Sequence, residues 1–313
     1  MKKNGLLFGF ALIISLYSTA QEGGALVKIF SNCKYDISNK EEIQAFKGFE
    51  IKRAYLGYKH KIDDKFSTNI IFDVGSNSSG SSYTAFLKIA SLKWSASEKL
   101  DINIGMVGTK NFKFMEKSWG RRYIEKSTMD KYNWASSADA GCTIDYILSE
   151  KIKFDAQVLN GEGYKRIESD ELFRAGCGLT YNILESLSLR IQHDISDNII
   201  TDQTITTAAI SYTNNKINIG GETNLMRNSE NIEEDEQNII SIYGAFNANE
   251  EYTLFARYDN ASESNYEENF VVYGIERKMT QGVSVALNVQ SRTDAAEGSE
   301  AENILFLNLE YTF

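Results

Sequence analysis

The sequence predicts an all-β fold, a transmembrane antiparallel β-barrel of about 16 strands. Three observations predict it. Apolar and polar residues alternate with period two along most of the 313-residue chain, tight turns and longer loops follow one another strictly, and proline is absent. Average usage near ~5% would give about 16 prolines in a chain of this length. Proline cannot donate to a β-ladder, so a chain built almost entirely of paired strands is a setting that excludes it.

The first 20 residues have the features of a secretory signal peptide. Lys2 and Lys3 form a positive start, an apolar stretch runs over 6–16, and Ser18-Thr19-Ala20 is a small-residue cleavage site. The apolar run is shorter than the roughly 18 residues of a membrane-spanning helix. We expect residues 1–20 to be cleaved and residues 21–313 to form the barrel. Cleavage removes two lysines, so the net charge of -10 falls to -12.

The strands are predicted by alternation, and the end of the chain is the clearest case. Leu305, Leu307 and Leu309 share one face with Tyr311 and Phe313, and polar residues occupy the other. The same pattern occurs over 100–106, 140–148, 187–192 and 283–290. Each run spans about 10 residues, the length of a tilted strand that crosses a bilayer. Segments 47–61 and 82–97 run longer and alternate imperfectly, and 202–213 is rich in threonine.

The connections fall into two classes that alternate along the chain. Short polar turns are expected near 63–64, 97–98, 149–150, 184–185, 214–215, 249–250 and 280–281. Longer loops are expected near 37–47, 75–82, 109–135, 160–170, 195–202, 227–236, 260–267 and 292–301. Both ends of the mature chain then fall on the short-turn side. Short periplasmic turns and long external loops are the asymmetry of an outer-membrane barrel.

The width of the barrel decides which way the apolar faces point. Side chains cannot fill a barrel of 16 strands, so we expect the apolar face to meet lipid and the polar face a hydrated lumen. Closure pairs every backbone N–H and C=O without a free edge. A secreted soluble β-protein that binds carbohydrate is the alternative from another class, and it requires the apolar faces to point inward.

Four segments carry a resemblance to a known family. They are Gly48–Tyr58 (GFEIKRAYLGY), Glu116–Gly120 followed by Arg122-Tyr123, Ser137–Gly141 (SADAG) and Asn160–Tyr164 (NGEGY). In this order and spacing the sequence resembles the phosphate-selective porin O and P family of Gram-negative outer membranes. The resemblance covers most of the mature chain.

The resemblance implies a pore of 16 strands, often a homotrimer, with the third loop folded into the lumen. In agreement with this implication, the third loop is the longest loop expected in this sequence. Terminal Phe313 resembles the signal by which the barrel-assembly machinery recognises its clients. The family's anion-selective members carry a ladder of arginines down one wall, and no full ladder can be traced here, so phosphate selectivity is not carried over.

The third loop is strongly basic. Between Lys110 and Ala135 there are seven basic and three acidic residues. A basic loop in a narrow lumen raises the local anion concentration, because low-dielectric walls focus its field. The candidates for an anion-binding constriction are four residues of this loop and three arginines placed on the lumen face by strand alternation: Lys113, Lys117, Arg121, Arg122, Arg174, Arg190 and Arg257.

The alternative is a loop whose charges are paired, with Glu116, Glu125 and the wall acids Asp139 and Asp145 as partners. Trp119 lies inside the loop and is expected to pin it to the wall, whereas Trp94 and Trp134 suit the interfacial aromatic girdles. The other loops are acidic, with runs near 230–236 and 297–302. These runs suit solvated loops, or divalent-cation bridges to lipopolysaccharide.

Little in the sequence favours catalysis, a metal or a cofactor. The chain has two histidines and three widely spaced cysteines, and its negative charge disfavours nucleic acid as a partner. His193 and Asp194 are neighbours on a predicted strand, so they point to opposite faces and cannot line one active site. The expected function is therefore a porin that passes small hydrophilic solutes, with a preference for phosphate-like anions that arises from the basic third loop and not from the family's arginine ladder. A narrow or plugged substrate-specific barrel, or a structural surface protein, is the alternative.

Overall fold

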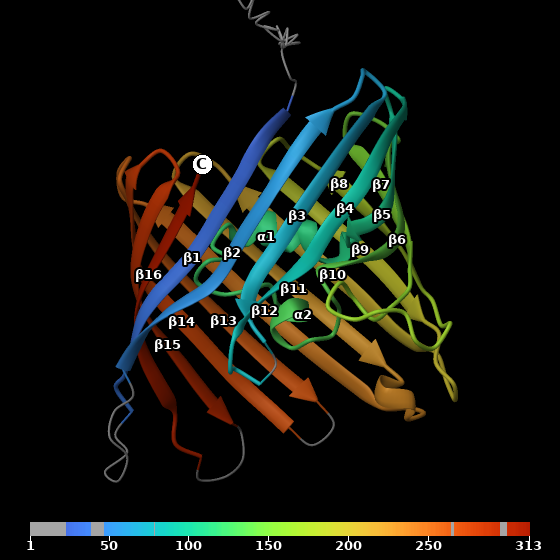
Figure 1. Ribbon diagram of the computed structural model, residues 1–313. Coiled ribbons are helices and arrows are strands. Elements are labelled where there is room, and N and C mark those ends of the chain that lie inside the picture. Colours follow the sequence, from blue (N-terminus) through green and yellow to red (C-terminus); the bar gives the residue numbers. More distant parts are fainter. Residues whose placement is uncertain (1–22, 39–46, 78, 264–265, 295–298) are drawn as a thin grey trace, which may run out of the picture.

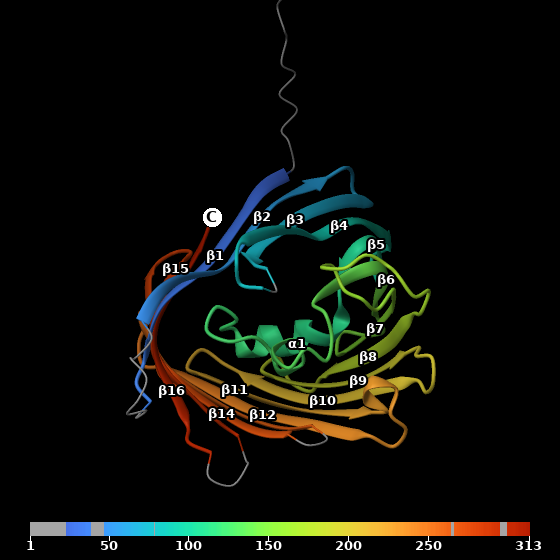
Figure 2. The same cartoon turned by 60° about the horizontal axis from the view of Figure 1, so that its bottom comes forward.

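A computed structural model describes residues 23–38, 47–77, 79–263, 266–294 and 299–313. The predicted signal peptide lies outside these residues. The described chain forms a closed antiparallel barrel in which each strand pairs with its sequence neighbours and β1 pairs with β16 (Figures 1 and 2). The predicted fold class is confirmed.

The barrel has 16 strands over the described residues. They are β1 (Gly23–Asp36), β2 (Lys47–Lys61), β3 (Phe66–Ser76), β4 (Tyr83–Ser97), β5 (Leu100–Gly108), β6 (Ala138–Ile147), β7 (Ile152–Leu159), β8 (Arg174–Asn182), β9 (Leu187–Ser196), β10 (Gln203–Thr213), β11 (Ile217–Arg227), β12 (Glu236–Asn247), β13 (Tyr252–Glu263), β14 (Tyr266–Thr280), β15 (Val283–Asp294) and β16 (Glu302–Thr312).

Helices are few in the described chain. The third loop holds α1 (Lys110–Trp119) and α2 (Thr128–Lys131), and a 3-10 turn, η1, spans Ser229–Asn231. None of the described helices is long and apolar enough to cross a bilayer.

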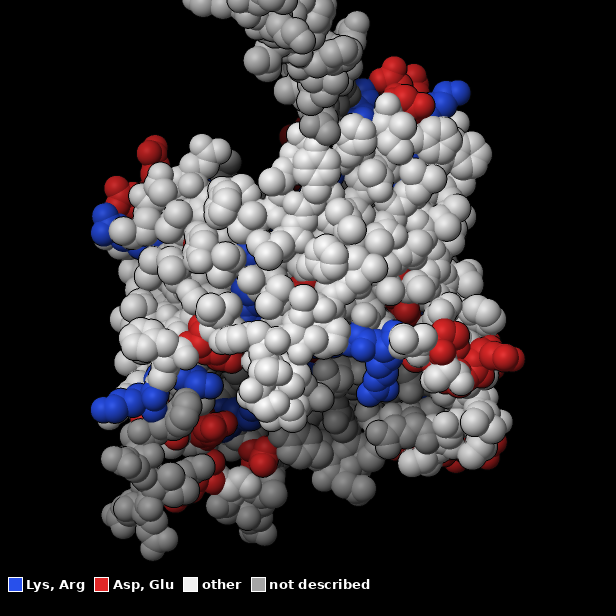
Figure 3. All heavy atoms as spheres, viewed as in Figure 1, with Lys and Arg blue, Asp and Glu red and all other residues white. Residues whose placement is uncertain are grey.

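The orientation of the strands agrees with the prediction. Leu287 on β15 and Leu307 on β16 point outward and are 47% and 49% exposed, whereas their inward neighbours Asn288 and Asn308 are buried. In Figure 3 a broad band of this face carries few charged side chains, and Lys, Arg, Asp and Glu gather mainly toward the two ends. The outer surface is therefore apolar and the inner surface polar, so the alternative of a soluble β-protein with inward apolar faces is wrong.

The two kinds of connection lie at opposite ends of the barrel. Gly23 and the C-terminus lie at the end that carries the short turns, at the top of Figure 1, and the long loops lie at the other end. One predicted loop is wrong: 260–267 is mostly strand, because β13 continues to Glu263 and Asn260 still pairs with Asn269 on β14.

The imperfect alternation of two segments has a structural cause. The register shifts between β1 and β2 opposite Lys52, and between β3 and β4 opposite Lys88. Each shift inserts one extra residue into a strand, which breaks the period of two and re-aims a side chain. Lys52 donates to the Ile124 carbonyl of the third loop, and the ammonium of Lys88 lies over the ring of Tyr55. Both bulged lysines therefore face the lumen.

Candidate functional site

The third loop (residues 109–137) folds into the barrel, as predicted, and Figure 2 shows α1 inside the ring of strands. Within α1, Phe112, Met115 and Trp119 share one face because they are three and four residues apart, and all three are buried. The helix ends at Gly120, whose left-handed backbone (φ 69°) lets its N–H donate to the Glu116 carbonyl.

The buried face of α1 rests on apolar residues of the lumen wall. A first cluster joins four loop residues, Phe112, Met115, Met129 and Trp134, to Ile205, Ala209, Met226, Ile239 and Ala261 on β10–β13. Trp134 is only 6% exposed and belongs to this cluster, so its expected place in an interfacial girdle is wrong. The loop is thus packed against the inner face of β10–β13.

A second apolar cluster holds the far end of the loop. The Trp119 ring lies 5.7 Å from that of Tyr243 and 6.1 Å from that of Phe255, measured between centroids. Tyr123 and Ile124 belong to the same cluster. Trp119 therefore pins the loop to the wall, as predicted.

The three wall arginines selected from the sequence each donate to a backbone carbonyl of the third loop. Arg190 bonds the Lys110 carbonyl (3.3 Å), Arg174 the Trp134 carbonyl (3.4 Å), and Arg257 the Lys126 carbonyl. The carbonyls of Trp134 and Lys126 lie outside helices and strands, so Arg174 and Arg257 satisfy acceptors that have no ladder partner, whereas Lys110 is the first residue of α1. The wall arginines hold the loop in place.

Acids compensate the charge of several of these arginines. Arg190 makes two hydrogen bonds to Asp155 (2.7 and 2.8 Å), and Arg257 makes two to Asp259 (2.7 and 2.9 Å). Arg121 of the loop lies 3.1 Å from Glu276. All three arginines are at most 9% exposed. Bidentate pairs of this kind fix geometry and leave little charge for a passing solute.

The expected ion pairs between charged residues of the third loop and acids are found in part. Arg122 pairs with Glu116 and Asp130, and Lys110 pairs with Asp145. Glu125 and Asp139 instead accept hydrogen bonds from backbone N–H groups, of Lys126 and of Ala140 and Gly161 respectively.

Two candidates lie on the opposite face of α1. Lys113 and Lys117 are exposed and line a pocket of about 300 Å³ together with Lys153 of β7. Within the described parts of the chain, none of these three lysines lies within ion-pair distance of an acid. The pocket therefore carries a net positive charge.

The structure also gathers the candidate Arg122 with four positive residues that were not among the candidates. Arg53 on β2, Lys88 on β4, Arg122 and Lys126 of the third loop, and Lys165 of the fourth loop (160–173) form what we call the basic cluster. Three acids lie among them: Asp73 is 3.1 Å from Arg53, and Asp130 is 2.7 Å from Arg122, which also pairs with Glu116. Five cations against three anions leave a net charge of +2.

The fourth loop also folds inward. The Tyr164 hydroxyl donates to Asp73 on β3, and the ammonium of Lys88 lies 5.0 Å from the centroids of both the Tyr164 and the Tyr55 rings. The loop can turn back because Gly163 lies against Ser136 with φ +81°, where a Cβ would come within 2.4 Å of that side chain. The sequence predicted only a long external loop here, near 160–170.

The charges of the two loops perturb one another. Burial and the positive charges of Arg53 and Lys126 lower the pKa of Lys165, although Asp73 acts in the other direction. Burial alone would raise the pKa of Asp130, but the charges of Arg122 and Lys126 lower it below its ordinary value. The lowered pKa of Asp130 reflects the positive charges beside it, whereas the lowered pKa of Lys165 arises first from burial.

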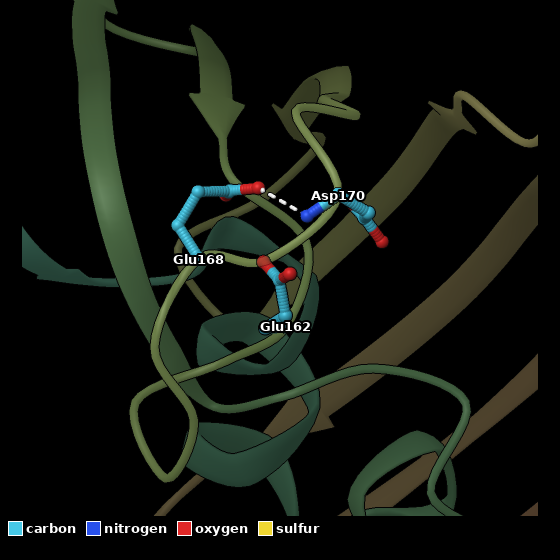
Figure 4. Close-up of side chains that lie close together, drawn as sticks. All are labelled: Glu162, Glu168 and Asp170. Atoms are coloured by element: carbon cyan, nitrogen blue, oxygen red, sulfur yellow. Dashed lines mark hydrogen bonds between the residues drawn. The ribbon is translucent and has the colours of Figure 1, made fainter.

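Three acids of the fourth loop, Glu162, Glu168 and Asp170, also lie close together (Figure 4). Glu168 accepts hydrogen bonds from the Asp170 and Glu171 N–H groups (3.1 and 2.8 Å), and Glu162 accepts one from the Ser169 N–H (3.1 Å). These bonds shape the loop, and two of the three acids are exposed.

The histidine considered for catalysis faces away from its neighbouring acid. His193 is exposed on the outer face and contacts Thr206 at 2.9 Å, whereas Asp194 is buried on the inner face. The two cannot form a base and its orienting acid, as the strand alternation predicted.

Comparison with known proteins identifies the fold. The chain matches no protein-family model and no curated protein. It is similar to solved structures of an anion-selective porin from Comamonas acidovorans (9% identity, 93% of this chain and 99% of that one, TM-score 0.72) and of the outer-membrane channel DcaP of Acinetobacter baumannii (10%, 95% and 99%, 0.67). It is also similar to the trimer form of OmpT, an outer-membrane protein of Vibrio cholerae (12%, 93% and 99%, 0.62). At these identities the likeness establishes a shared 16-strand barrel.

Proposed function

We propose that this chain is an outer-membrane porin that passes small hydrophilic solutes by diffusion and prefers anions. The observation that carries the proposal is the barrel's inside-out polarity combined with a third loop fixed across the lumen. An apolar exterior suits lipid and a polar interior suits water. The fold is shared with outer-membrane porins and channels, and passive diffusion is the function that this architecture supports best.

The basic cluster supports the anion preference. Its net charge of +2 lies between the third loop and the wall of β2–β4, where low-dielectric surroundings strengthen the field. The seven residues selected from the sequence divide between two roles in this proposal. Arg122, Lys113 and Lys117 act on the solute, whereas Arg121, Arg174, Arg190 and Arg257 chiefly hold the loop.

A plugged or narrow barrel is the competing function, because the third and fourth loops both fold inward. Reconstitution of the mature chain in planar bilayers and liposomes separates the two. We expect steady ionic current and swelling with small neutral sugars. A barrel that inserts without current or swelling would establish the plugged alternative.

Further features of the proposal follow from the sequence. We infer that residues 1–20 are a cleaved signal peptide, that Phe313 is read by the barrel-assembly machinery, and that outer-membrane lipid and lipopolysaccharide surround the protein. The homotrimer is proposed on the same basis, supported by the trimer form of the Vibrio cholerae protein. Chemical cross-linking in intact outer membranes tests the trimer, and a product no larger than a monomer would contradict it.

A further inference from the structure

The outer face of the barrel is hollowed over β8–β12, away from the lumen and the basic cluster. Two depressions of about 520 Å³ each lie there, one at mid-height and one nearer the long loops. Ala208, Thr223 and Ile240 line both depressions, so the two form one continuous groove. We call it the outer groove. It opens onto the surface that meets lipid in the proposed porin.

Small residues beside large ones produce the groove. Outward residues paired across β9–β12 repeat this pattern at two successive levels: Ile191, Ala208, Thr223 and Ile240, and then Leu189, Ile210, Gly221 and Ile242. Ala208 and Gly221 leave open the space between the larger side chains beside them. Most of this lining is aliphatic and exposed, so an apolar chain seated on it is favoured. The mid-height part of the groove therefore fits an acyl chain.

The groove becomes polar toward the long loops. Five polar residues line that part: His193, Thr204, Thr206, Arg227 and Asn238. Each lies within three residues of the strand end that carries a long loop. In a bilayer the ends of the spanning strands lie at the level of the lipid head groups. The two parts of the groove therefore match the two parts of an amphiphile.

Several of these polar groups have no partner in the described chain. The side chains of Thr204, Thr223 and Asn238 make no hydrogen bond within the described residues. His193 uses only Nδ1, which lies 2.9 Å from the Thr206 hydroxyl. Hydrocarbon cannot satisfy such donors and acceptors, and burying them unpaired in it is costly. They therefore indicate a partner with hydroxyl or phosphate oxygens at this end of the groove.

The charge at this end is compensated within the protein. Arg227 donates through Nε to Glu236 (3.1 Å), and both side chains are exposed. The pair adds no net charge, while the two Nη groups of Arg227 still face solvent or lipid head groups. Recognition here therefore depends on hydrogen bonds more than on net charge, which suits a head group rich in hydroxyls.

The order of the two chemistries along the groove sets the orientation of its ligand. The head of the ligand lies beside the long loops, on the external side of the proposed porin, and its chain points toward the middle of the membrane. A lipid of the external leaflet has this orientation. A lipid of the periplasmic leaflet would require the polar end beside the short turns. Lipopolysaccharide, an external-leaflet lipid, joins acyl chains to a phosphorylated sugar head.

We propose that the outer groove binds one lipopolysaccharide molecule per protomer. One acyl chain lies beside Ala208 and Gly221, and the sugar hydroxyls contact Thr204 and Asn238. The inference rests on the proposed porin function and goes beyond it, since it assigns a specific lipid site to one part of the wall.

Native mass spectrometry of the full mature chain tests the site. The delipidated protein is mixed with lipopolysaccharide and phosphatidylethanolamine at equal concentrations, and we expect it to retain one lipopolysaccharide in preference. N238L should lower the retained fraction about fivefold, the effect of losing one neutral hydrogen bond. A208F should lower it at least as much, because its ring occupies the place of the chain. A256F is the matched control, an exposed alanine of β13 outside the groove, and it should change nothing.

The outcomes separate this inference from the proposed function. Equal retention in A208F, N238L and A256F, or a preference for phosphatidylethanolamine, would overturn the site. Should A208F fail to fold, N238L compared with the unmodified chain decides. Planar-bilayer current is recorded from the same preparation. A conducting barrel that retains no lipopolysaccharide overturns the site alone, whereas a silent barrel that retains it overturns the porin alone.

Discussion

At the residue scale, the unexpected finding is that bulges supply part of the basic lumen. Lys52 and Arg53 are consecutive, yet both point inward, because the extra residue at the bulge resets the alternation. Lys88 is the bulged residue of β4 and lies above two tyrosine rings. Strict alternation along β2 would point one of the two consecutive residues, Lys52 or Arg53, toward lipid. It therefore misses this part of the site.

A charge reversal at Lys88 tests the basic cluster. K88E changes the cluster from +2 to zero, so we expect the anion preference of the current to fall strongly. The reversal potential under a salt gradient measures this. K99E in the short turn between β4 and β5 has the same charge change far from the cluster, and it should leave the reversal potential nearly unchanged. Equal shifts in both variants would show that net charge, not position, sets selectivity.

The pKa of Lys110 predicts a response to alkaline pH. Burial and the charge of Lys113 lower it to about 8, although Asp145 acts in the opposite direction. Lys110 therefore loses its charge as pH rises from 7 to 9, and we expect the anion preference to decline over that interval. K110R, which stays charged, should abolish the part of the decline due to this residue.

Proton linkage determines whether the lowered pKa of Lys110 makes the protein more or less stable as pH rises. The folded protein releases this proton at lower pH than the unfolded chain, whose lysine has a pKa near ~10.4. Between these values the unfolded state binds more protons, so this group's contribution to stability rises with pH and reaches its full value above the unfolded pKa. Lys110 alone would make the protein more stable at pH 10 than at pH 7.

At the element scale, the third loop is a packed element and behaves as part of the wall. Its helix was not predicted, although the spacing of Phe112, Met115 and Trp119 contains the helical period. The short run was obscured by the strand pattern around it. The inward apolar residues that seat the helix, such as Ile239 and Phe270, also go against the alternation rule for a hydrated lumen. A strand with apolar residues on both of its faces was the signal in the sequence that could have indicated this contact.

Removal of Trp119 tests whether the loop is fixed by packing. W119A deletes a side chain that is 2% exposed and contacts two aromatic rings. Loss of a buried tryptophan costs about 3–5 kcal/mol, which here opposes the docking of the loop. We expect a larger and noisier single-channel current with the barrel still folded. W94A on the outer face is the control, and quiet current in W119A would argue that the loop is held by its polar bonds alone.

At the scale of the whole molecule, the barrel and its polarity could be predicted because period-two alternation is repeated in every strand. Segment 305–313 predicted both a strand and its outward face. The boundaries of the loops were harder to predict, since the polar residues at 260–263 and 266–267 belong to β13 and β14. The site was the hardest part to predict from the sequence. It joins residues of β2, β4 and two inward loops, and that contact depends on the closure of the sheet.

Two arginine substitutions at similar height test the polarity of the wall. Ile104 points outward and is 56% exposed, whereas Ser91, opposite the neighbouring Gly105, points inward. We expect I104R to lower the free energy of unfolding in lipid by about 2–4 kcal/mol, the cost of a charge on the lipid face. S91R should change it little. Denaturant titration in lipid vesicles measures both, and equal costs would contradict the assigned faces.

The reversal potential of the unmodified mature chain in a planar bilayer, under a potassium chloride gradient, tests the central claim most directly. The proposed porin conducts, and the sign of its reversal potential shows that chloride crosses more readily than potassium. A potential of the opposite sign, or a membrane that stays silent after the barrel has inserted, would contradict the account.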